Sequence, residues 1–195
     1  MSHYFENDEN LVSEIKPFSI SINNTLFNFN TDNGVFSKGE LDYGTNLLIK
    51  NVLKLNIAGD VLDLGCGYGA IGIILAKIAN VSVTMSDINR RALHLTKMNA
   101  KKNNVSVSII ESDGYLNITD KFDYVISNPP IRVGKKKLYE LLLDTKNHLN
   151  ENGKLIIVIR KEQGALSLIK DMNQYYKIDV LDKDKGFFII SLKSC

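Results

Sequence analysis

From residue 61 onward, the chain alternates between two patterns of apolar and polar positions. Short apolar runs are typical of buried strands, and segments with apolar residues every three or four positions are typical of amphipathic helices. The expected strands are 61–64, 81–85, 105–110, 122–127 and 155–160, and the expected helices between them are 70–78, 89–103, 136–149 and 164–172. This alternation predicts an α/β fold in which helices cover both faces of a parallel sheet.

The C-terminal part departs from this alternation. Residues 176–181 and 187–192 are strand-like runs, and only 182–186 lie between them. Such a connection has room for a hairpin but not for a crossover helix, so the last strand is expected to be antiparallel. The prediction is a seven-stranded, mostly parallel sheet that finishes in an antiparallel C-terminal hairpin.

The N-terminal part predicts a short β-hairpin extension. Residues 18–22 and 26–29 alternate in polarity around an Asn-Asn pair, which favours a tight turn. A loop over 31–43 and a helix over 45–55 lead from this hairpin into the alternating region.

The composition is that of an ordinary globular protein, because the 195 residues are 44% hydrophobic and 24% charged. These proportions exclude a disordered or low-complexity chain. We find no linker long enough to separate two domains. We therefore expect a single domain over 1–195 that acts as a monomer, with an N-terminal extension over 1–43 and the α/β core over 44–195.

The formal charge of +2 does not by itself indicate a protein that binds polyanions. The charges are unevenly distributed, however. Residues 88–102 contain five basic residues and no acidic one, 132–137 contain four basic residues, and 1–15 contain four acidic residues and no Lys or Arg. A solvated helix face is the simpler interpretation of the first cluster. The near-neutral total is a cancellation between regions, so it does not exclude RNA.

The cysteines, the histidines and the hydropathy indicate a soluble cytoplasmic protein without a metal site. Cys66 and Cys195 are far apart, and no signal-peptide pattern opens the chain. The longest uncharged apolar stretch, 64–76, is shorter than the ~20 residues of a membrane helix and contains glycines. The three histidines lack metal-ligand spacing with one another or with the cysteines.

A glycine-rich turn follows the first expected strand of the core. Glycines at 65, 67 and 69 allow positive φ and remove the Cβ atoms that would keep a ligand away from the backbone. By itself the turn is equally compatible with a strand-to-helix connection that binds nothing. Cys66 lies between two of these glycines, where a small packing residue is a simpler interpretation than a nucleophile.

Acidic residues lie in or just after three successive strands. Asp63 lies inside a strand, where a carboxylate is costly without a donor or cationic partner, so it favours a ligand with an ammonium group over a pyrophosphate. Asp87 ends the second strand, where a carboxylate can accept both ribose hydroxyls, and Asp113 follows the third, where it can accept from an adenine amine. A helix cap or a solvated turn is the alternative for Asp87 and for Asp113.

The sequence Asn128-Pro129-Pro130 follows the fourth strand. The two proline rings stiffen this loop and hold the Asn128 amide and the Pro129 carbonyl in fixed directions. These two acceptors can bind the two hydrogens of a planar exocyclic amine and aim its lone pair at an electrophilic methyl group. A proline-terminated strand with a turn-favouring Asn is the alternative.

Together these motifs resemble the class I S-adenosylmethionine-dependent methyltransferases of the small-domain type, which methylate guanine N2 in small-subunit ribosomal RNA. The resemblance rests on the segments 63–69, 86–89 and 128–131, and the segment 34–45 resembles the part that closes over the cofactor in these enzymes. It implies a Rossmann-like methyltransferase fold with S-adenosylmethionine as the cofactor. Members often have an aromatic residue where this chain has Ile131.

The resemblance also implies the site residues. Those expected at the cofactor are Phe36, Asp42, Thr45, Asp63, Gly65, Cys66, Gly67, Asp87, Ile88, Asp113, Gly114 and Asn128. Those expected to hold the target amine are Asn128, Pro129 and Pro130, and those expected at the substrate are Ile131, Arg132, Lys135 and Lys136. The cationic side chains would contact RNA phosphates without reading the sequence.

The expected activity is methylation of an exocyclic amine, guanine N2 of 16S ribosomal RNA, with ribosomal RNA or the small ribosomal subunit as partner. Two alternatives stay open. Adenine N6 or a protein glutamine side chain are acceptors for other enzymes with an Asn-Pro-Pro loop, although these favour Tyr as the fourth residue. A catalytically inactive RNA-binding relative is the other alternative, against which the intact acidic, glycine and asparagine positions argue.

Overall fold

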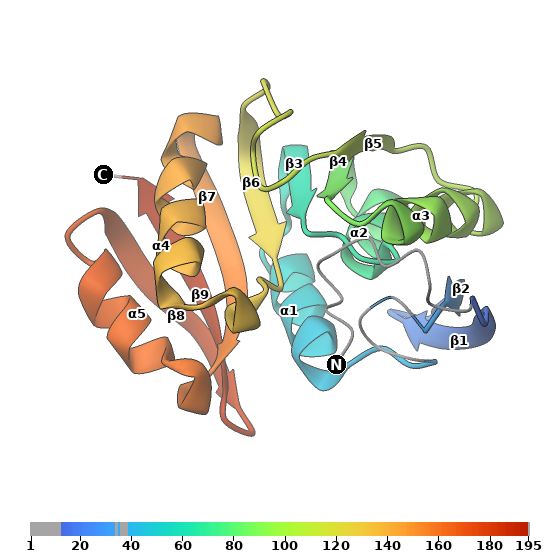
Figure 1. The fold of residues 1–195 in the computed structure, drawn as a ribbon, viewed down its shortest axis with the longest axis horizontal. Helices are drawn as coiled ribbons and strands as arrows, with labels where there is room; N and C mark the ends of the chain where they lie inside the picture. Colours follow the sequence, from blue (N-terminus) through green and yellow to red (C-terminus); the bar gives the residue numbers. More distant parts are fainter. Residues whose placement is uncertain (1–12, 34, 36–38, 195) are drawn as a thin grey trace.

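A seven-stranded mixed sheet forms the centre of the protein (Figure 1). The computed structural model describes residues 13–33, 35 and 39–194. The strands of this sheet are β3 (Ala58–Leu64), β4 (Asn80–Asp87), β5 (Ser108–Glu111), β6 (Phe122–Ser127), β7 (Leu149–Arg160), β8 (Tyr176–Asp184) and β9 (Phe187–Ser194). Their order is β5-β4-β3-β6-β7-β9-β8, and β9 is antiparallel to both of its neighbours. The predicted sheet and its antiparallel C-terminal hairpin are confirmed.

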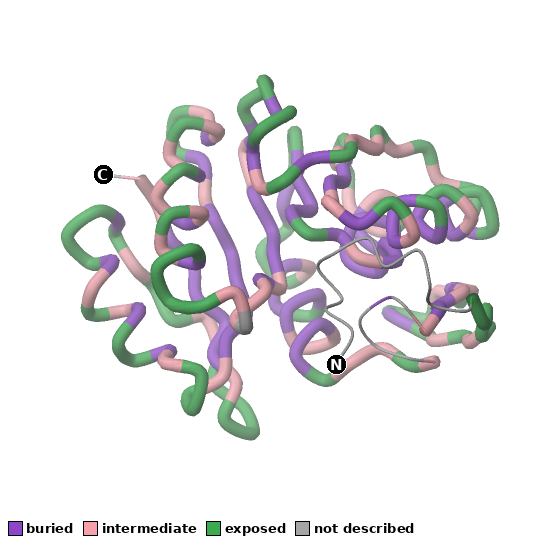
Figure 2. The backbone as a smooth tube through the Cα atoms, viewed as in Figure 1, coloured by how far each residue is buried: buried purple, intermediate pink, exposed green. Residues whose placement is uncertain are grey.

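Helices cover both faces of the sheet. They are α1 (Tyr43–Lys54), α2 (Ala70–Ile78), α3 (Arg90–Lys102), α4 (Lys135–Asp144) and α5 (Ala165–Met172), with 3₁₀ turns η1 (Ile131–Val133), η2 (Thr145–His148) and η3 (Lys161–Gln163). In β7, Ile156 and Val158 face the core under α1, α2 and α3, whereas Leu155 and Ile157 face the core under α4 and α5. This period-two alternation produces two apolar layers, and Figure 2 shows the central strands as largely buried between the helices.

An N-terminal hairpin packs against α3. Its strands are β1 (Lys16–Ile22) and β2 (Thr25–Thr31), which pair antiparallel as predicted. The two residues between them, Asn23 and Asn24, have φ of 48° and 61°, which is the backbone of a tight hairpin turn. Figure 1 places this hairpin beside α2 and α3, away from β8 and β9.

The fourth core helix ends earlier than the predicted 136–149. Helix α4 stops at Asp144, and the chain continues through η2 into β7. The buried Thr145 hydroxyl donates to the Leu141 carbonyl at 3.0 Å and bonds the Tyr115 hydroxyl at 2.7 Å. A threonine that bonds back to the preceding turn in this way favours the end of a helix.

Strand β7 begins at Leu149 instead of the predicted 155, because Leu149 already pairs with Phe122. The register then shifts before Lys154 pairs with Tyr124. Gly153 lies within this irregular stretch, where an added Cβ would lie 2.9 Å from the Phe122 carbonyl oxygen. A hydrophobicity pattern does not detect this first part of the strand because its side chains are polar.

Other boundaries also differ from the prediction, as at β5 and at the connection between β8 and β9. Strand β5 starts at Ser108 instead of 105, because the Val105 amide donates to the Ala100 carbonyl at 3.1 Å and so extends the end of α3. The connection between β8 and β9 consists of Lys185 and Gly186, with φ of 45° and 81°, where the sequence suggested five residues. Among the described residues, no helix is long and apolar enough to cross a membrane.

Candidate active site

Hydrogen bonds join the carboxyl ends of three neighbouring strands, β4, β3 and β6. The Ser127 hydroxyl, at the end of β6, donates to the Leu64 carbonyl at 2.8 Å. The amides of Gly65 and Cys66 donate to the Ser86 carbonyl on β4 at 2.8 and 2.9 Å. The loops that follow these strands therefore start from a rigid base, as a binding crevice in an α/β sheet requires.

The glycine-rich turn presents open backbone at Gly65 and Gly67, which have φ of 72° and 57°. Among the residues that the structure describes, a Cβ added at Gly65 would meet no atom within 4 Å, and one added at Gly67 would meet Val35 at 3.9 Å. At Gly72, by contrast, an added Cβ would lie 2.7 Å from the Met85 side chain. Helix packing therefore excludes a side chain at Gly72, whereas Gly65 and Gly67 leave accessible backbone for a ligand.

The underside of the turn is held by α3. The Thr96 hydroxyl donates to the Gly67 carbonyl at 2.8 Å, and the Asn99 amide donates to the Tyr68 carbonyl at 2.8 Å. The Cys66 thiol is buried against Thr96, and burial raises the pKa of this thiol well above its usual value. The buried thiol thus packs against α3, which fits the small packing residue that the sequence favours over a nucleophile.

Asp63 is fully buried beneath the turn. Its Oδ2 accepts from the Gly72 amide at 2.8 Å, and its Oδ1 has no hydrogen-bond partner among the described residues. Burial raises the pKa of Asp63 to about 7, and the nearby charge of Asp87 adds to this shift while the Gly72 hydrogen bond opposes it. An unpaired buried carboxylate oxygen is costly, and a cationic ligand group at this position would remove that cost.

Asp87 ends β4 beside the turn. Its Oδ2 accepts from the Gly67 amide at 2.9 Å, and its Oδ1 accepts from the Asn89 amide at 2.8 Å. Burial raises the pKa of Asp87, an effect that these backbone hydrogen bonds oppose. Each oxygen keeps further acceptor capacity for a ligand hydroxyl. The half-buried Ile88 lies between Asp87 and Asn89, the residue that caps α3.

The segment after β5 lies next to Asp87, because the Ser112 amide donates to the Asp87 carbonyl at 3.0 Å. Asp113 is exposed and follows Ser112 directly. Gly114 has φ of 55° and accepts the Ser112 hydroxyl at its carbonyl. Asp113, the third predicted acidic residue, thus lies at the carboxyl ends of the parallel strands, as do Asp63 and Asp87.

The Asn128 amide is held by a residue of α1. Its Nδ2 donates to the Thr45 hydroxyl oxygen at 2.9 Å. Thr45 is in turn held by the N-cap of the helix, because the Thr45 amide donates to Asp42 Oδ1 at 3.0 Å. This fixes the plane of the Asn128 amide and leaves its Oδ1 to accept from a substrate. The placement of Asp42 and Thr45 at the cofactor stays a prediction. The separation of 83 residues gives no sign in the sequence that Thr45 contacts Asn128.

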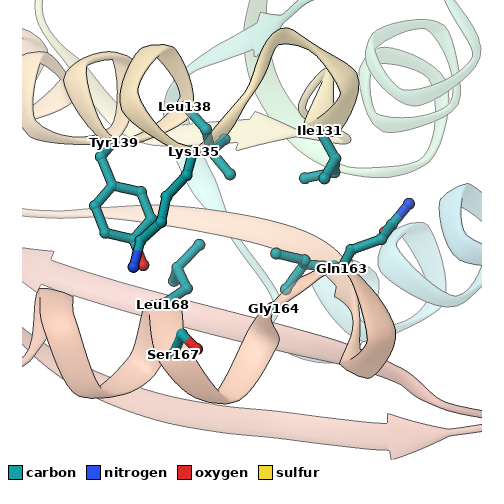
Figure 3. A pocket seen from close by; sticks show the side chains of 9 residues that line it. Ile131, Lys135, Leu138, Tyr139, Gln163, Gly164, Ser167 and Leu168 are labelled. Atoms are coloured by element: carbon teal, nitrogen blue, oxygen red, sulfur yellow. The ribbon is translucent and has the colours of Figure 1, made fainter.

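The residues expected at the substrate lie around the start of α4. Ile131 lines a pocket of about 180 Å³ between α4 and α5 (Figure 3). Lys135 donates to Asp171 at 2.8 Å, so it points along this pocket toward α5. Lys136 is exposed and pairs loosely with Glu140 at 3.9 Å. Arg132 lies in η1 with its side chain outside the described part, and Phe36 lies outside the described residues altogether.

A sequence model of the methyltransferase small domain matches residues 26–191. The chain belongs to the methyltransferase small domain family. This match confirms the predicted family, and it spans the hairpin strand β2, the glycine-rich turn, the Asn-Pro-Pro loop and most of the C-terminal hairpin.

The chain is also similar to individual proteins. An uncharacterized protein YbxB of Bacillus subtilis is 38% identical over 98% of both chains. Ribosomal RNA small subunit methyltransferase C of Haemophilus influenzae is 42% identical over 83% of this chain and 49% of its own length. The chain thus spans about half the length of the methyltransferase C relatives that it matches.

The fold of this family member is shared with a solved structure. The 16S rRNA N2 G1207 methyltransferase RsmC of T. Thermophilus, in complex with AdoMet and guanosine, superposes with a TM-score of 0.81 at 22% identity. The match covers 93% of this chain and 51% of that one. A ribosomal protein L11 methylase of Lactobacillus delbrueckii superposes with a TM-score of 0.72 at 21% identity.

Proposed function

We propose that the protein is an S-adenosylmethionine-dependent methyltransferase that modifies the exocyclic N2 amine of a guanine in small-subunit ribosomal RNA. The observation that carries the proposal is the orientation of the Asn128 amide by Thr45, beside the open glycine-rich turn. This arrangement leaves a fixed acceptor, Asn128 Oδ1, next to backbone that a ligand can approach.

The residues beneath the turn fit the cofactor that the family implies. S-adenosylmethionine supplies an electrophilic methyl group on a sulfonium centre, and it carries an ammonium group and a ribose. The unpaired Oδ1 of Asp63 suits a cationic group, and the remaining acceptor capacity of Asp87 suits ribose hydroxyls. The backbone of Gly65 and Gly67 would lie along the extended part of the ligand.

The Asn-Pro-Pro loop suits an amine acceptor. Pro129 is buried, and Pro130 precedes η1, so the loop between β6 and α4 is rigid. Asn128 Oδ1 and the Pro129 carbonyl would accept the two amine hydrogens and turn the nitrogen lone pair toward the methyl donor. The amine proton becomes acidic when the new N–C bond forms, and solvent then removes it. A strong base is therefore not required before transfer.

Ribosomal RNA is proposed as the substrate on two grounds. Relatives with the name ribosomal RNA small subunit methyltransferase C share about 40% of the aligned residues, and the superposed RsmC acts on guanine N2. In addition, the basic residues at 132–137 follow the Asn-Pro-Pro loop directly, where cations would contact phosphates. A target base inside a helix would have to be flipped out to reach Asn128.

The test is transfer of a tritiated methyl group to 16S RNA and to small ribosomal subunits from cells that lack this protein. The products are digested to nucleosides. N2-methylguanosine supports the proposal, whereas N6-methyladenosine, or label in a protein glutamine, would assign a different acceptor. Failure to label any of these substrates would contradict the enzymatic function.

Asn128→Ala provides the mechanistic comparison in this assay, and Asn147→Ala is its matched control. Asn147 is exposed and lies in η2, which precedes the amino end of β7, whereas Asn128 follows the carboxyl end of the parallel strand β6. We expect Asn128→Ala to lose transfer by a factor of about 100 or more and Asn147→Ala to match the wild type. Equal incorporation by all three proteins would exclude a role for the Asn128 amide.

A further inference from the structure

A pocket between η1 and α4 on one side and η3 and α5 on the other opens directly beyond the Asn-Pro-Pro loop (Figure 3). Ile131, the residue after Pro130, forms one end of it. Gln163 and Gly164 line the other side, just after the end of β7. Because β6 and β7 are parallel neighbours, their carboxyl ends lie side by side, so the pocket lies close to the Asn-Pro-Pro loop that follows β6.

The floor of this pocket is aliphatic and its rim is polar. Leu138, Ile159 and Leu168 form the floor and are almost fully buried. Gln163 and Ser167 stand on the rim and are exposed. An apolar surface with polar groups around its edge fits a planar ring whose faces are apolar and whose edge carries hydrogen-bonding atoms.

The polar rim presents fixed donors. Gln163 Oε1 accepts from the Arg160 amide at 3.1 Å, which fixes the amide and leaves Nε2 to donate. Lys135 uses one of its three N–H bonds on Asp171 at 2.8 Å, and the Tyr139 hydroxyl donates to the same carboxylate oxygen at 2.9 Å. The wall formed by Lys135, Tyr139 and Asp171 is thus held in place, while the Lys135 ammonium keeps two donors. These donors favour a ligand that presents acceptors.

We propose that this pocket binds the nucleobase next to the methylated nucleotide in a single-stranded segment of the RNA substrate. An RNA base has a flat apolar face for the aliphatic floor, and guanine, cytosine and uracil present carbonyl oxygens to the donors on the rim. The phosphate that joins this base to the target nucleotide would lie near the basic residues 135–137. This subsite rests on the proposed function.

Filling the pocket tests this subsite. Ser167→Trp places a large side chain at the rim from an exposed position, so it does not disturb the core. Leu166→Trp is the matched control, because Leu166 is 53% exposed and precedes Ser167 on α5, yet it does not line the pocket. Binding is measured by fluorescence anisotropy with a short labelled RNA that contains one guanosine flanked by uridines, and again with an abasic site beside the guanosine.

We expect Ser167→Trp to weaken binding of the intact RNA about tenfold, as loss of one stacked base does, and Leu166→Trp to leave it unchanged. The abasic RNA should bind all three proteins alike. In the methylation assay, Ser167→Trp should raise KM for the RNA about tenfold, while kcat and methylation of free guanosine stay the same. Free guanosine has no neighbouring base, so this comparison separates the subsite from the target-base site.

The outcomes that contradict the subsite are distinct from those that contradict the proposed function. If Ser167→Trp binds the intact RNA as tightly as Leu166→Trp, the subsite is excluded whether or not the protein methylates RNA. If Ser167→Trp also loses methylation of free guanosine, the pocket belongs to the target base and the proposal is wrong. If the wild type binds RNA in a Ser167-dependent way but transfers no methyl group, the pocket binds a base, whereas the proposed enzymatic function and the place of that base beside a methylated nucleotide are both excluded.

Discussion

Thr45 and Asn128 lie 83 residues apart in the chain, and a hydrogen bond of 2.9 Å joins the Asn128 amide nitrogen to the Thr45 hydroxyl oxygen. Thr45 belongs to the first turn of α1, and Asn128 follows β6 directly. An amide that can rotate would present its nitrogen or its oxygen to a substrate. In this structure the amide nitrogen faces Thr45 and the oxygen faces away from it, so α1 orients the acceptor that follows the fourth core strand.

Replacement of Thr45 by valine should slow methyl transfer. Thr45→Val keeps the volume of the side chain but removes the hydroxyl, so the Asn128 amide loses its fixed orientation. We expect kcat to fall by a factor of about 10 to 100. Thr45→Ser restores the hydroxyl and should recover most of kcat. An unchanged kcat in Thr45→Val would show that this hydrogen bond does not contribute to transfer.

Cofactor affinity should increase with pH through the range in which Asp63 ionises. The pKa of the buried carboxyl is about 7 in the free protein, and a bound ammonium group would favour its charged form. Binding below pH 7 must therefore release a proton, so affinity rises from pH 5 to about pH 7 and then levels off. Titration calorimetry in buffers of different ionisation enthalpy measures this proton release. Asp63→Asn should bind about tenfold or more weakly and release no proton.

The same carboxyl should make the free protein less stable as the pH rises. The folded pKa of about 7 lies above the usual 3.8, so the stabilising contribution is complete below pH 3.8 and is lost as the pH rises through about 7. We expect the free energy of unfolding of the wild type, relative to Asp63→Asn, to fall by on the order of 4 kcal/mol between pH 4 and pH 8. Urea denaturation at several pH values measures this difference.

Asp60→Asn provides the control for that stability experiment, because Asp60 lies on the same strand and is exposed. It should show the same pH dependence as the wild type. A wild-type curve that runs parallel to that of Asp63→Asn would mean that the Asp63 carboxylate has a partner that removes the cost of its burial.

Asn99 should couple the N-terminal hairpin to the glycine-rich turn. Its amide donates to the carbonyls of both Asn30 and Tyr68, and its oxygen accepts from the Asn30 amide. Asn103, one turn later, forms the equivalent pair of hydrogen bonds with Asn28 but does not bond the turn. Either residue replaced by leucine should lose about 2–4 kcal/mol of stability, because buried backbone groups are left without partners.

The two asparagine variants should differ in cofactor binding. Asn99→Leu releases the Tyr68 carbonyl and should weaken cofactor affinity at a temperature where both variants are folded, whereas Asn103→Leu should not. Thermal denaturation and calorimetry on both proteins make the comparison. Equal cofactor affinities would show that Asn99 serves hairpin docking alone.

The asparagines of α3 also illustrate what the sequence could and could not predict. Local patterns were sufficient for α2, whose predicted bounds of 70–78 match the structure, because apolar periodicity and a preceding glycine both indicate this helix. Asn99 and Asn103, in contrast, resemble ordinary polar positions of a helix, yet they are buried and form hydrogen bonds with the backbone of β2. Their partners are about 70 residues away, and no spacing rule connects positions that meet only through the tertiary fold.

The acidic and glycine positions were accessible to sequence analysis for the opposite reason. Asp63, Gly65 and Asp87 belong to segments whose spacing follows from a single strand-turn-helix-strand unit, so the fold class alone brings them together. The polar first part of β7 and the early end of α4 were not predicted, because they depend on Thr145 and Gly153 in their tertiary surroundings.

Two glycine substitutions should separate ligand binding from packing. At Gly65 an added methyl group meets none of the described residues within 4 Å, but φ of 72° makes an alanine there strained by about 1–2 kcal/mol. Gly65→Ala should therefore lower stability modestly and, because the methyl group would stand where the ligand approaches, weaken cofactor binding about tenfold or more. Gly72→Ala pushes against the fully buried Met85 side chain and should cost about 1–3 kcal/mol of stability.

The readouts for this pair are urea denaturation without ligand and cofactor affinity by calorimetry under conditions where both variants are folded. We expect Gly72→Ala to bind the cofactor within about threefold of the wild type, since its methyl group faces the helix-sheet interface. If Gly65→Ala bound as tightly as the wild type, the open backbone at Gly65 would not be the surface that the cofactor contacts. The cofactor would then have to bind farther from Gly65 and closer to Asn128.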